Sequence, residues 1–136
     1  MNIKKEIDLP VAKIIYLQNQ IICLRFKDNI IVTAKDAQMI DEAYVELADN
    51  KPFTSLVDSR DIRGDLTTEA RDFFAKDQLI RPLRKGQAIV VNSLANKLFA
   101  DFYMKFHKPF DPVKVFNNDF DGAVKWLLSL PLDKEY

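Results

Sequence analysis

Two adjacent threonines, Thr67 and Thr68, stand where the sequence predicts the start of a helix. The first turn of a helix presents unpaired backbone N–H groups and the positive end of the helix dipole, and both favour a phosphate. We therefore identify Thr67 and Thr68 as candidate phospho-acceptors, because an added phosphate would bring charge and acceptor oxygens to a docking surface. The ordinary structural explanation is that a threonine at this place only caps the helix.

Five charged side chains of alternating sign follow the predicted strand 53–57. The carboxyl end of a central strand is the usual ligand site of open α/β sheets. Carboxylates there could act as acid and base or hold Mg²⁺. Interleaved arginines instead favour mutual neutralisation, because a neighbouring like charge is what raises the pKa of a carboxyl group. We therefore expect an interaction loop of ion pairs, and an enzyme built on carboxylates near the first of them is the less favoured alternative. The loop residues are Asp58, Arg60, Asp61, Arg63 and Asp65.

Aromatic side chains are concentrated between residues 99 and 110. A single buried stripe of a helix would explain them as ordinary core packing. Apolar side chains outside that stripe predict contact with a partner or with an apolar ligand. The candidate face consists of Phe99, Tyr103, Met104 and Phe110.

Several kinds of site are excluded by what the sequence lacks. The single cysteine, Cys23, and the single histidine, His107, are far apart and do not form the usual zinc site of nitrogen and sulfur ligands. A lone cysteine also forms no disulfide within the chain and requires no oxidising compartment. The three glycines are isolated, so neither a dinucleotide-binding nor a P-loop fingerprint is present. We expect no metal and no cofactor.

Composition and charge narrow the class of protein further. The chain has 136 residues, of which 48% are hydrophobic, so one domain over residues 1–136 can form a core. Twenty Lys and Arg side chains balance twenty Asp and Glu side chains, which argues against a general nucleic-acid binder. There is neither a secretory signal pattern nor a stretch of about 20 apolar residues that would span a membrane. We expect a cytoplasmic protein without a transmembrane segment.

Hydrophobic periodicity predicts the elements that position these residues. Period-2 and β-branched runs predict strands, and apolar residues at a spacing of 3.6 predict helices. Strands separated by helices should run parallel, and the opening hairpin should supply an antiparallel edge. The result is an α/β fold with a mixed, mostly parallel sheet and about four helices. The predicted strands are 12–17, 21–26, 30–32, 53–57, 87–91 and 113–116, and the predicted helices are 34–49 and those beginning near 67, 93 and 119.

This order of elements, together with particular segments, resembles the STAS-like group of sigma-factor antagonists and their relatives. That group is structurally akin to CRAL-TRIO lipid-binding domains, and the chain is most similar to a small bacterial branch described as STAS/CRAL-TRIO-like. The resemblance covers most of the chain. The segments that carry it are 56–58, 68–75, 88–93, 98–103, 108–109, 113–116 and 123–127.

The resemblance implies a regulatory function for the domain. In STAS antagonists a serine in an Asp-Ser-Ser-Gly-like setting, at the start of the helix after the central strand, accepts phosphate from a kinase. The equivalent segment here, 64–68, has hydroxyl groups but lacks that motif. Two hypotheses follow: a non-enzymatic regulatory or protein-interaction module, or a small carrier or sensor of a lipid or other apolar molecule. An exposed edge or an apolar helix face would also suit a homodimer.

Overall fold

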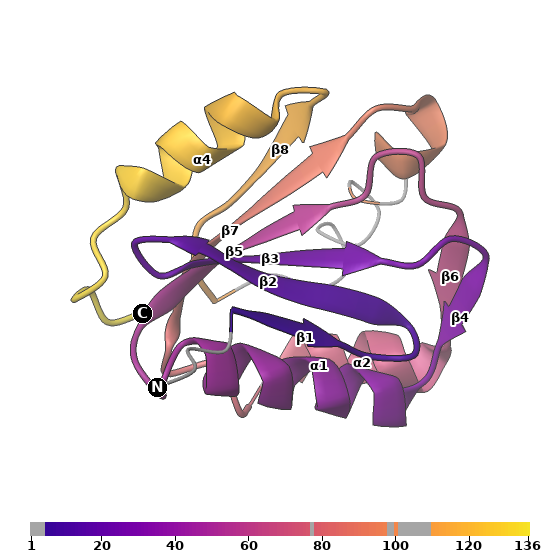
Figure 1. Cartoon of the computed structure of the whole chain (residues 1–136), viewed down its shortest axis with the longest axis horizontal. Coiled ribbons are helices and arrows are strands. Elements are labelled where there is room, and N and C mark those ends of the chain that lie inside the picture. The colour runs from indigo at the N-terminus through magenta and orange to yellow at the C-terminus, as the bar shows by residue number, and fades with distance from the viewer. Residues whose placement is uncertain (1–4, 77, 98–99, 101–109) are drawn as a thin grey trace.

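The computed structural model describes residues 5–76, 78–97, 100 and 110–136. Its centre is a six-stranded sheet in the order β1-β2-β3-β5-β7-β8 (Figure 1). The first three strands are antiparallel, and β3, β5, β7 and β8 are parallel to one another. The strands are β1 Glu6–Asp8, β2 Ala12–Gln18, β3 Ile21–Phe26, β5 Phe53–Asp58, β7 Arg84–Val91 and β8 Val113–Asn117.

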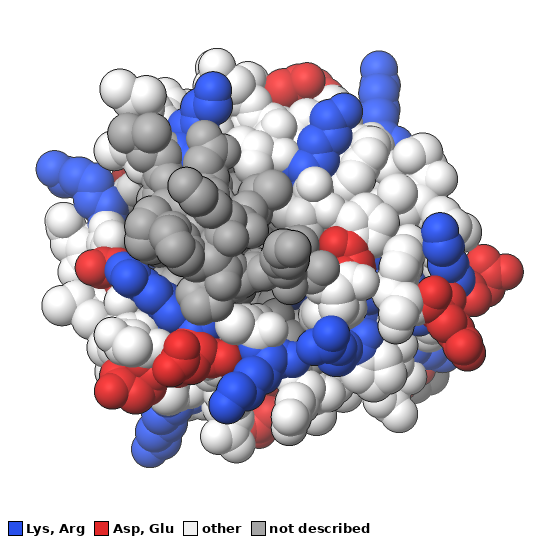
Figure 2. Space-filling model, turned by 180° about the vertical axis from the view of Figure 1, so that it is seen from behind, with Lys and Arg blue, Asp and Glu red and all other residues white. Residues whose placement is uncertain are grey.

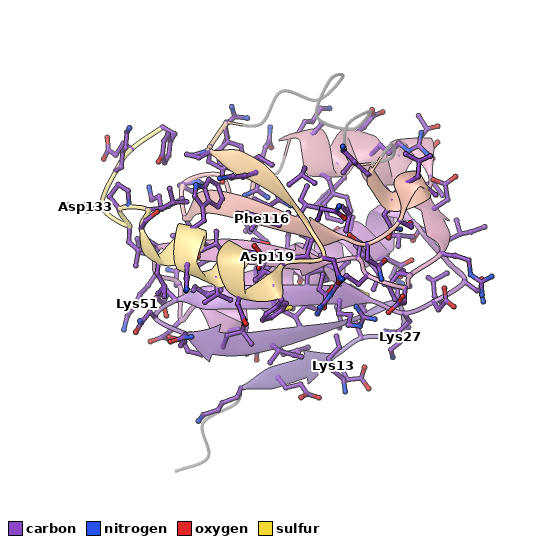
Figure 3. The ribbon with its side chains drawn as sticks, turned by 90° about the horizontal axis from the view of Figure 1, so that it is seen from above. Lys13, Lys27, Lys51, Phe116, Asp119 and Asp133 are labelled. Atoms are coloured by element: carbon purple, nitrogen blue, oxygen red, sulfur yellow. The ribbon has the colours of Figure 1, made fainter. Side chains whose placement is uncertain are left out.

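Helices cover both faces of this sheet. Two of them, α1 and α2, lie side by side on one face, and α4 lies on the other (Figure 1). Seen from above, Asp119, which precedes α4, lies beside the β8 residue Phe116, whereas Lys13 and Lys27 lie toward the β1 edge (Figure 3). The mixed α/β fold class predicted from the sequence is therefore confirmed. The helices are α1 Ala34–Leu47, α2 Thr68–Lys76 and α4 Phe120–Leu128.

The alternation of strand side chains divides the core between the two faces. In β3, Ile22 and Leu24 pack toward α1, while Ile21 and Cys23 pack toward α4. Successive residues of a strand point to opposite faces, so a strand covered on both faces must be apolar at nearly every position. This explains the nearly continuous apolar runs of the central strands.

A second, two-stranded parallel sheet closes the carboxyl ends of the main strands. It consists of β4, Ile30–Val32, and β6, Gly64–Leu66 (Figure 1). The sequence predicted a strand at 30–32 but missed its partner β6. It also missed β1, which pairs antiparallel with β2, so the antiparallel edge predicted from the opening hairpin has one strand more than predicted. Three residues are too few for a periodic pattern to be recognised.

Side-chain caps fix the beginnings of the helices. Thr33 and Asp36 form a complete capping box at α1, as predicted. Asp119 caps α4 by accepting a hydrogen bond from the backbone N–H of Gly122. Ser93 accepts one from the N–H of Asn96, where the predicted third helix begins, and residues 94–97 are helical. The remaining candidate residues of that helix, Phe99, Tyr103 and Met104, lie outside the described residues.

Candidate functional site

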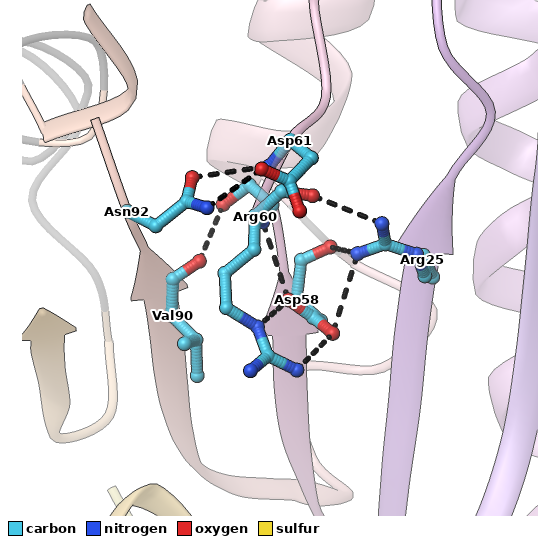
Figure 4. A network of polar contacts seen from close by, with 7 residues as sticks. Arg25, Asp58, Arg60, Asp61, Val90 and Asn92 are labelled. Atoms are coloured by element: carbon cyan, nitrogen blue, oxygen red, sulfur yellow. Dashed lines mark hydrogen bonds and ion pairs between the residues drawn. The ribbon is translucent and has the colours of Figure 1, made fainter. Parts of the chain in front are cut away.

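The carboxylate of Asp58, at the end of β5, is the centre of a compact ion-pair network (Figure 4). Arg60 donates to both oxygens, with Nε–Oδ1 and Nη2–Oδ2 distances of 2.9 and 3.0 Å. From the neighbouring strand β3, the Nη1 atom of Arg25 lies 3.3 Å from Asp58 Oδ2. Arg25 also donates to the carbonyl oxygen of Arg60 at 2.9 Å, so it holds both the side chain and the backbone of the loop.

These contacts decide the protonation of Asp58, which is only 6% exposed. Burial alone would raise its pKa, but the hydrogen bonds from Arg60 and the charges of Arg25 and Arg60 outweigh burial, so the pKa of Asp58 lies below its ordinary value. The group is therefore ionised at neutral pH. A general acid would need a raised pKa, and Asp58 has the opposite shift.

The loop after Asp58 is fastened to the end of β7. The backbone N–H and the Oγ atom of Ser59 both donate to the carbonyl oxygen of Val90, at 3.0 and 2.9 Å. Asp61 and Asn92 bind each other twice: the Asp61 N–H donates to Asn92 Oδ1, and Asn92 Nδ2 donates to Asp61 Oδ1 at 2.8 Å. Asp61 adopts a positive φ of 60°, a conformation that aspartate tolerates better than most residues.

The far end of the loop is fastened elsewhere, to the turn before β4. The N–H of Arg63 donates to Asp28 Oδ1 at 2.7 Å, and the N–H of Asn29 donates to the Arg63 carbonyl at 2.6 Å. Asp65 forms an ion pair with Arg71 of α2 at 2.6 Å. The five predicted loop residues are thus not one cluster, because the buried Asp58 pairs with the half-buried Arg60, whereas the other three are exposed and have separate partners.

The two candidate phospho-acceptors differ in accessibility. Thr67 is half-buried, and its Oγ1 accepts a hydrogen bond from the N–H of Ala70, which is the capping role expected from the sequence. Its own N–H donates to the carbonyl of Val32 at 2.9 Å, joining α2 to β4. Thr68 is exposed. Phosphorylation of either residue stays a prediction.

A cavity of about 780 Å³ lies between the sheet and the helices α1 and α2, at the carboxyl ends of β3, β5 and β7. The two-stranded sheet β4–β6 forms one wall of it. Twelve apolar side chains contribute most of the described surface. They are Leu24, Phe26, Ile30, Val32, Val57, Ile62, Leu66, Phe74, Ile80, Ile89, Ala95 and Ala100.

Buried polar side chains line the same cavity. Tyr44 of α1 shares a 2.7 Å hydrogen bond with Ser55 of β5, and burial raises the pKa of the Tyr44 hydroxyl. Asp41 lies one turn earlier in α1 and is fully buried. Arg84 forms two hydrogen bonds with Asp111, at 2.9 and 3.2 Å.

Sequence reasoning missed this polar wall, although one signal was present. Asp41 stands four residues after Ala37 and three before Tyr44, so it falls within the apolar stripe of α1. A carboxylate in such a stripe predicts a buried polar position. Arg84 gave no comparable signal, because it precedes the apolar run from which the strand was predicted.

Two other predicted positions have structural surroundings. The ring of Phe110 is half-buried, with the guanidinium carbons of Arg81 and Arg84 each 4.8 Å from its centroid. Phe110 is not among the described residues that line the cavity. Cys23 is buried, and burial raises the pKa of its thiol to about 12, so the thiolate form is scarce at neutral pH.

The described part of the chain contains no group of three His, Cys, Asp or Glu side chains that could hold a metal ion. Charged side chains of both signs are interspersed on the face shown in Figure 2. Within the same described residues, no helix has the length and apolar character needed to cross a membrane.

Comparison with known proteins identifies a family and a fold. Residues 15–130 match the family described as Domain of unknown function (DUF7793). A similar solved structure is the crystal structure of an uncharacterized protein of the DUF3478 family, with a SpoIIAA-like fold, from Shewanella loihica PV-4. The two are 18% identical, with a TM-score of 0.59, and the match covers 85% of this chain and 91% of the other. At that identity the likeness shows the STAS-like fold alone. No curated protein matches the chain.

Proposed function

The chain belongs to this family of unknown function, and we propose that it is a non-enzymatic STAS-like domain that binds a small, largely apolar ligand as a carrier or sensor. The observation that carries the proposal is the cavity of about 780 Å³ beneath β4–β6. Small-molecule sites usually have volumes of about 300–1,000 Å³, mostly apolar walls and a few polar groups. Ligand binding there would be driven by removing apolar surface from water, at roughly 25 cal/mol per Å².

The reactive groups of the described residues support a binding rather than a catalytic function. Asp58 is an ionised carboxylate held by two arginines, so it lacks the raised pKa of a general acid. The hydroxyl of Tyr44 and the thiol of Cys23 have raised pKa values, which disfavours their nucleophilic forms. A cytoplasmic location is part of the proposal, and a lone buried cysteine that forms no disulfide within the chain is compatible with it.

Native mass spectrometry of the freshly purified full chain tests the proposal. We expect a bound small-molecule mass and binding of a neutral apolar dye such as Nile red. Ile89→Trp, which fills the cavity from β7, should weaken dye binding at least tenfold. Ile31→Trp is the matched control, because Ile31 is 67% exposed on β4. A chain that carries no ligand mass and binds no dye would contradict the proposal.

A second candidate function is protein interaction through the loop 58–65. It is favoured because backbone hydrogen bonds fix this loop at both ends while Asp61, Arg63 and Asp65 remain exposed. A charged surface held in one conformation loses little entropy on binding and can select a partner of complementary charge.

The partner of that loop could be a second copy of the chain, so sedimentation velocity is a direct test. We expect a concentration-dependent dimer that the double variant Asp61→Ala, Arg63→Ala weakens. The variant Asp49→Ala, at an exposed residue outside the loop, should sediment like the unmodified chain. A strict monomer at all concentrations would contradict the homodimer form of this candidate function.

A further inference from the structure

Among the described residues that line the cavity, the charged side chains are balanced in sign. Three of them are cationic, Lys27, Arg63 and Arg84, and three are acidic. A ligand with a carboxylate group would be attracted by the cationic side chains and repelled by the acidic ones, and the reverse holds for a ligand with an ammonium group. The acidic lining residues are Asp41, Asp61 and Asp65.

The cationic side chains are already engaged by other acids. Lys27 lies 2.9 Å from Asp8, and Arg84 lies 2.9 Å from the buried carboxylate of Asp111. Arg63 lies 3.5 Å from the Asp28 carboxylate. Only the pair of Arg84 is buried, so an anionic group that binds Arg84 would have to displace the Asp111 carboxylate and leave a buried charge without a partner, which is strongly disfavoured. At Lys27 and Arg63, whose pairs are exposed, an anionic group would compete with the carboxylate already bound.

The acids at the rim are engaged in the same way. Asp65 pairs with Arg71 at 2.6 Å, and Asp61 accepts a hydrogen bond from Asn92 at 2.8 Å. A cationic ligand would therefore share these carboxylates with an existing donor.

Neutral hydrogen-bonding groups occupy the same end of the cavity. They come from β7, from the segment that follows it and from the loop after β5, next to the apolar walls contributed by Val57 and Ile89. Such groups can pair with a hydroxyl or an amide without any ionic partner. The neutral polar lining residues are Ser59, Gln87, Asn92, Ser93 and Asn96.

We infer that the cavity selects uncharged amphiphiles, with an apolar body and a neutral polar end such as a hydroxyl, over the carboxylate or amine of the same length. The inference rests on the proposed ligand-binding function and names the ligand class. An apolar body would contact Leu24, Val57 and Ile89, while its polar end would lie toward Asn92 and Ser93.

Titration calorimetry of the full chain with decanol, decanoate and decylamine, at pH 7 and below their micellar concentrations, tests this selection. We expect decanol to bind at least tenfold more tightly than either charged compound. Any charged compound is costly to transfer out of water, whatever the cavity lining is. Variants of lining residues are therefore needed to show that the lining contributes to the selection. Asp61→Asn removes one rim acid and keeps an oxygen for Asn92, and it should shift the decanoate-to-decanol affinity ratio about threefold toward decanoate. Arg63→Gln should shift the decylamine-to-decanol ratio toward decylamine by a similar factor.

The control variant Asp49→Asn removes an exposed acid that does not line the cavity, and should leave both ratios unchanged. Decanoate or decylamine binding as tightly as decanol would overturn the inference and leave the binding function intact. Ratios that neither Asp61→Asn nor Arg63→Gln moves would also overturn it, since the selection would then come from transfer out of water alone. If no compound binds and no ligand mass is retained, the proposed function itself fails.

Discussion

The buried ion pair between Arg84 and Asp111 gives the sharpest test of how the structure is held together. The Asp111 side chain is fully buried and that of Arg84 is 7% exposed. Two hydrogen bonds join them, and they fasten the segment before β8 to the first residue of β7. Asp111→Ala would leave the Arg84 guanidinium buried without this carboxylate.

Removing one partner of a buried pair typically costs about 3–5 kcal/mol, because the remaining charge stays desolvated. Small domains have total stabilities of about 5–15 kcal/mol, so we expect Asp111→Ala to lose a large part of the free energy of unfolding. Asp111→Asn keeps one acceptor oxygen for Arg84, and we expect it to cost less, about 1–3 kcal/mol.

Urea denaturation followed by circular dichroism measures these differences at pH 7. The matched control is Asp49→Asn, because the pair between Lys51 and Asp49 is 3.5 Å long and its side chains are 67% and 86% exposed. Such surface pairs contribute about 0–1 kcal/mol. If Asp111→Ala destabilised the protein no more than Asp49→Asn, the reasoning that this buried pair secures the sheet would be refuted.

Three further predictions concern the loop, the cavity wall and the thiol. Asp58→Asn should destabilise the chain by about 1–3 kcal/mol at pH 7. Because the pKa of Asp58 is lowered in the fold, this difference in unfolding free energy should shrink as the pH falls from about 4 through the lowered pKa. A difference that stays constant during acid denaturation would contradict the prediction. Gly64→Ala should separate β4 from β6 and weaken dye binding, because a Cβ there would lie 2.5 Å from the Ile30 carbonyl oxygen. In the control Gly86→Ala, the closest contact of the new Cβ is the end of the flexible Leu130 side chain, so the loss of unfolding free energy in urea should be smaller. Cys23 should react with Ellman's reagent only as the chain unfolds, and fast labelling of the folded protein would show that the thiol is not buried.

The long elements could be predicted from the sequence because their patterns repeat. The helix α1 was predicted as 34–49 and ends at Leu47, and the strand 21–26 was predicted at its observed bounds. The strand predicted as 87–91 begins three residues earlier, at Arg84, because a charged side chain that is buried through an ion pair interrupts the apolar pattern. The strands β1 and β6 hold their places through pairing with distant segments, and no local pattern encodes that pairing.

The sequence predicted an interaction loop at the end of the sheet where the cavity lies, but it did not predict the cavity. The rule that open sheets bind ligands at the carboxyl ends of their strands led to the loop after Asp58, and the cavity lies at that end. The residues of its walls, such as Val32 and Ile80, follow the same apolar pattern as residues of a filled core. Hydrophobic periodicity shows which face of an element is turned away from water, but it does not show whether the side chains of facing elements are in contact. The cavity depends on the distance between the backbone of β4–β6 and the main sheet. Contacts that hold β4–β6 in place, such as the hydrogen bond from the Asn29 N–H to the Arg63 carbonyl oxygen, affect that distance. Variants that change this spacing should therefore alter ligand binding more than variants that change hydrophobicity alone.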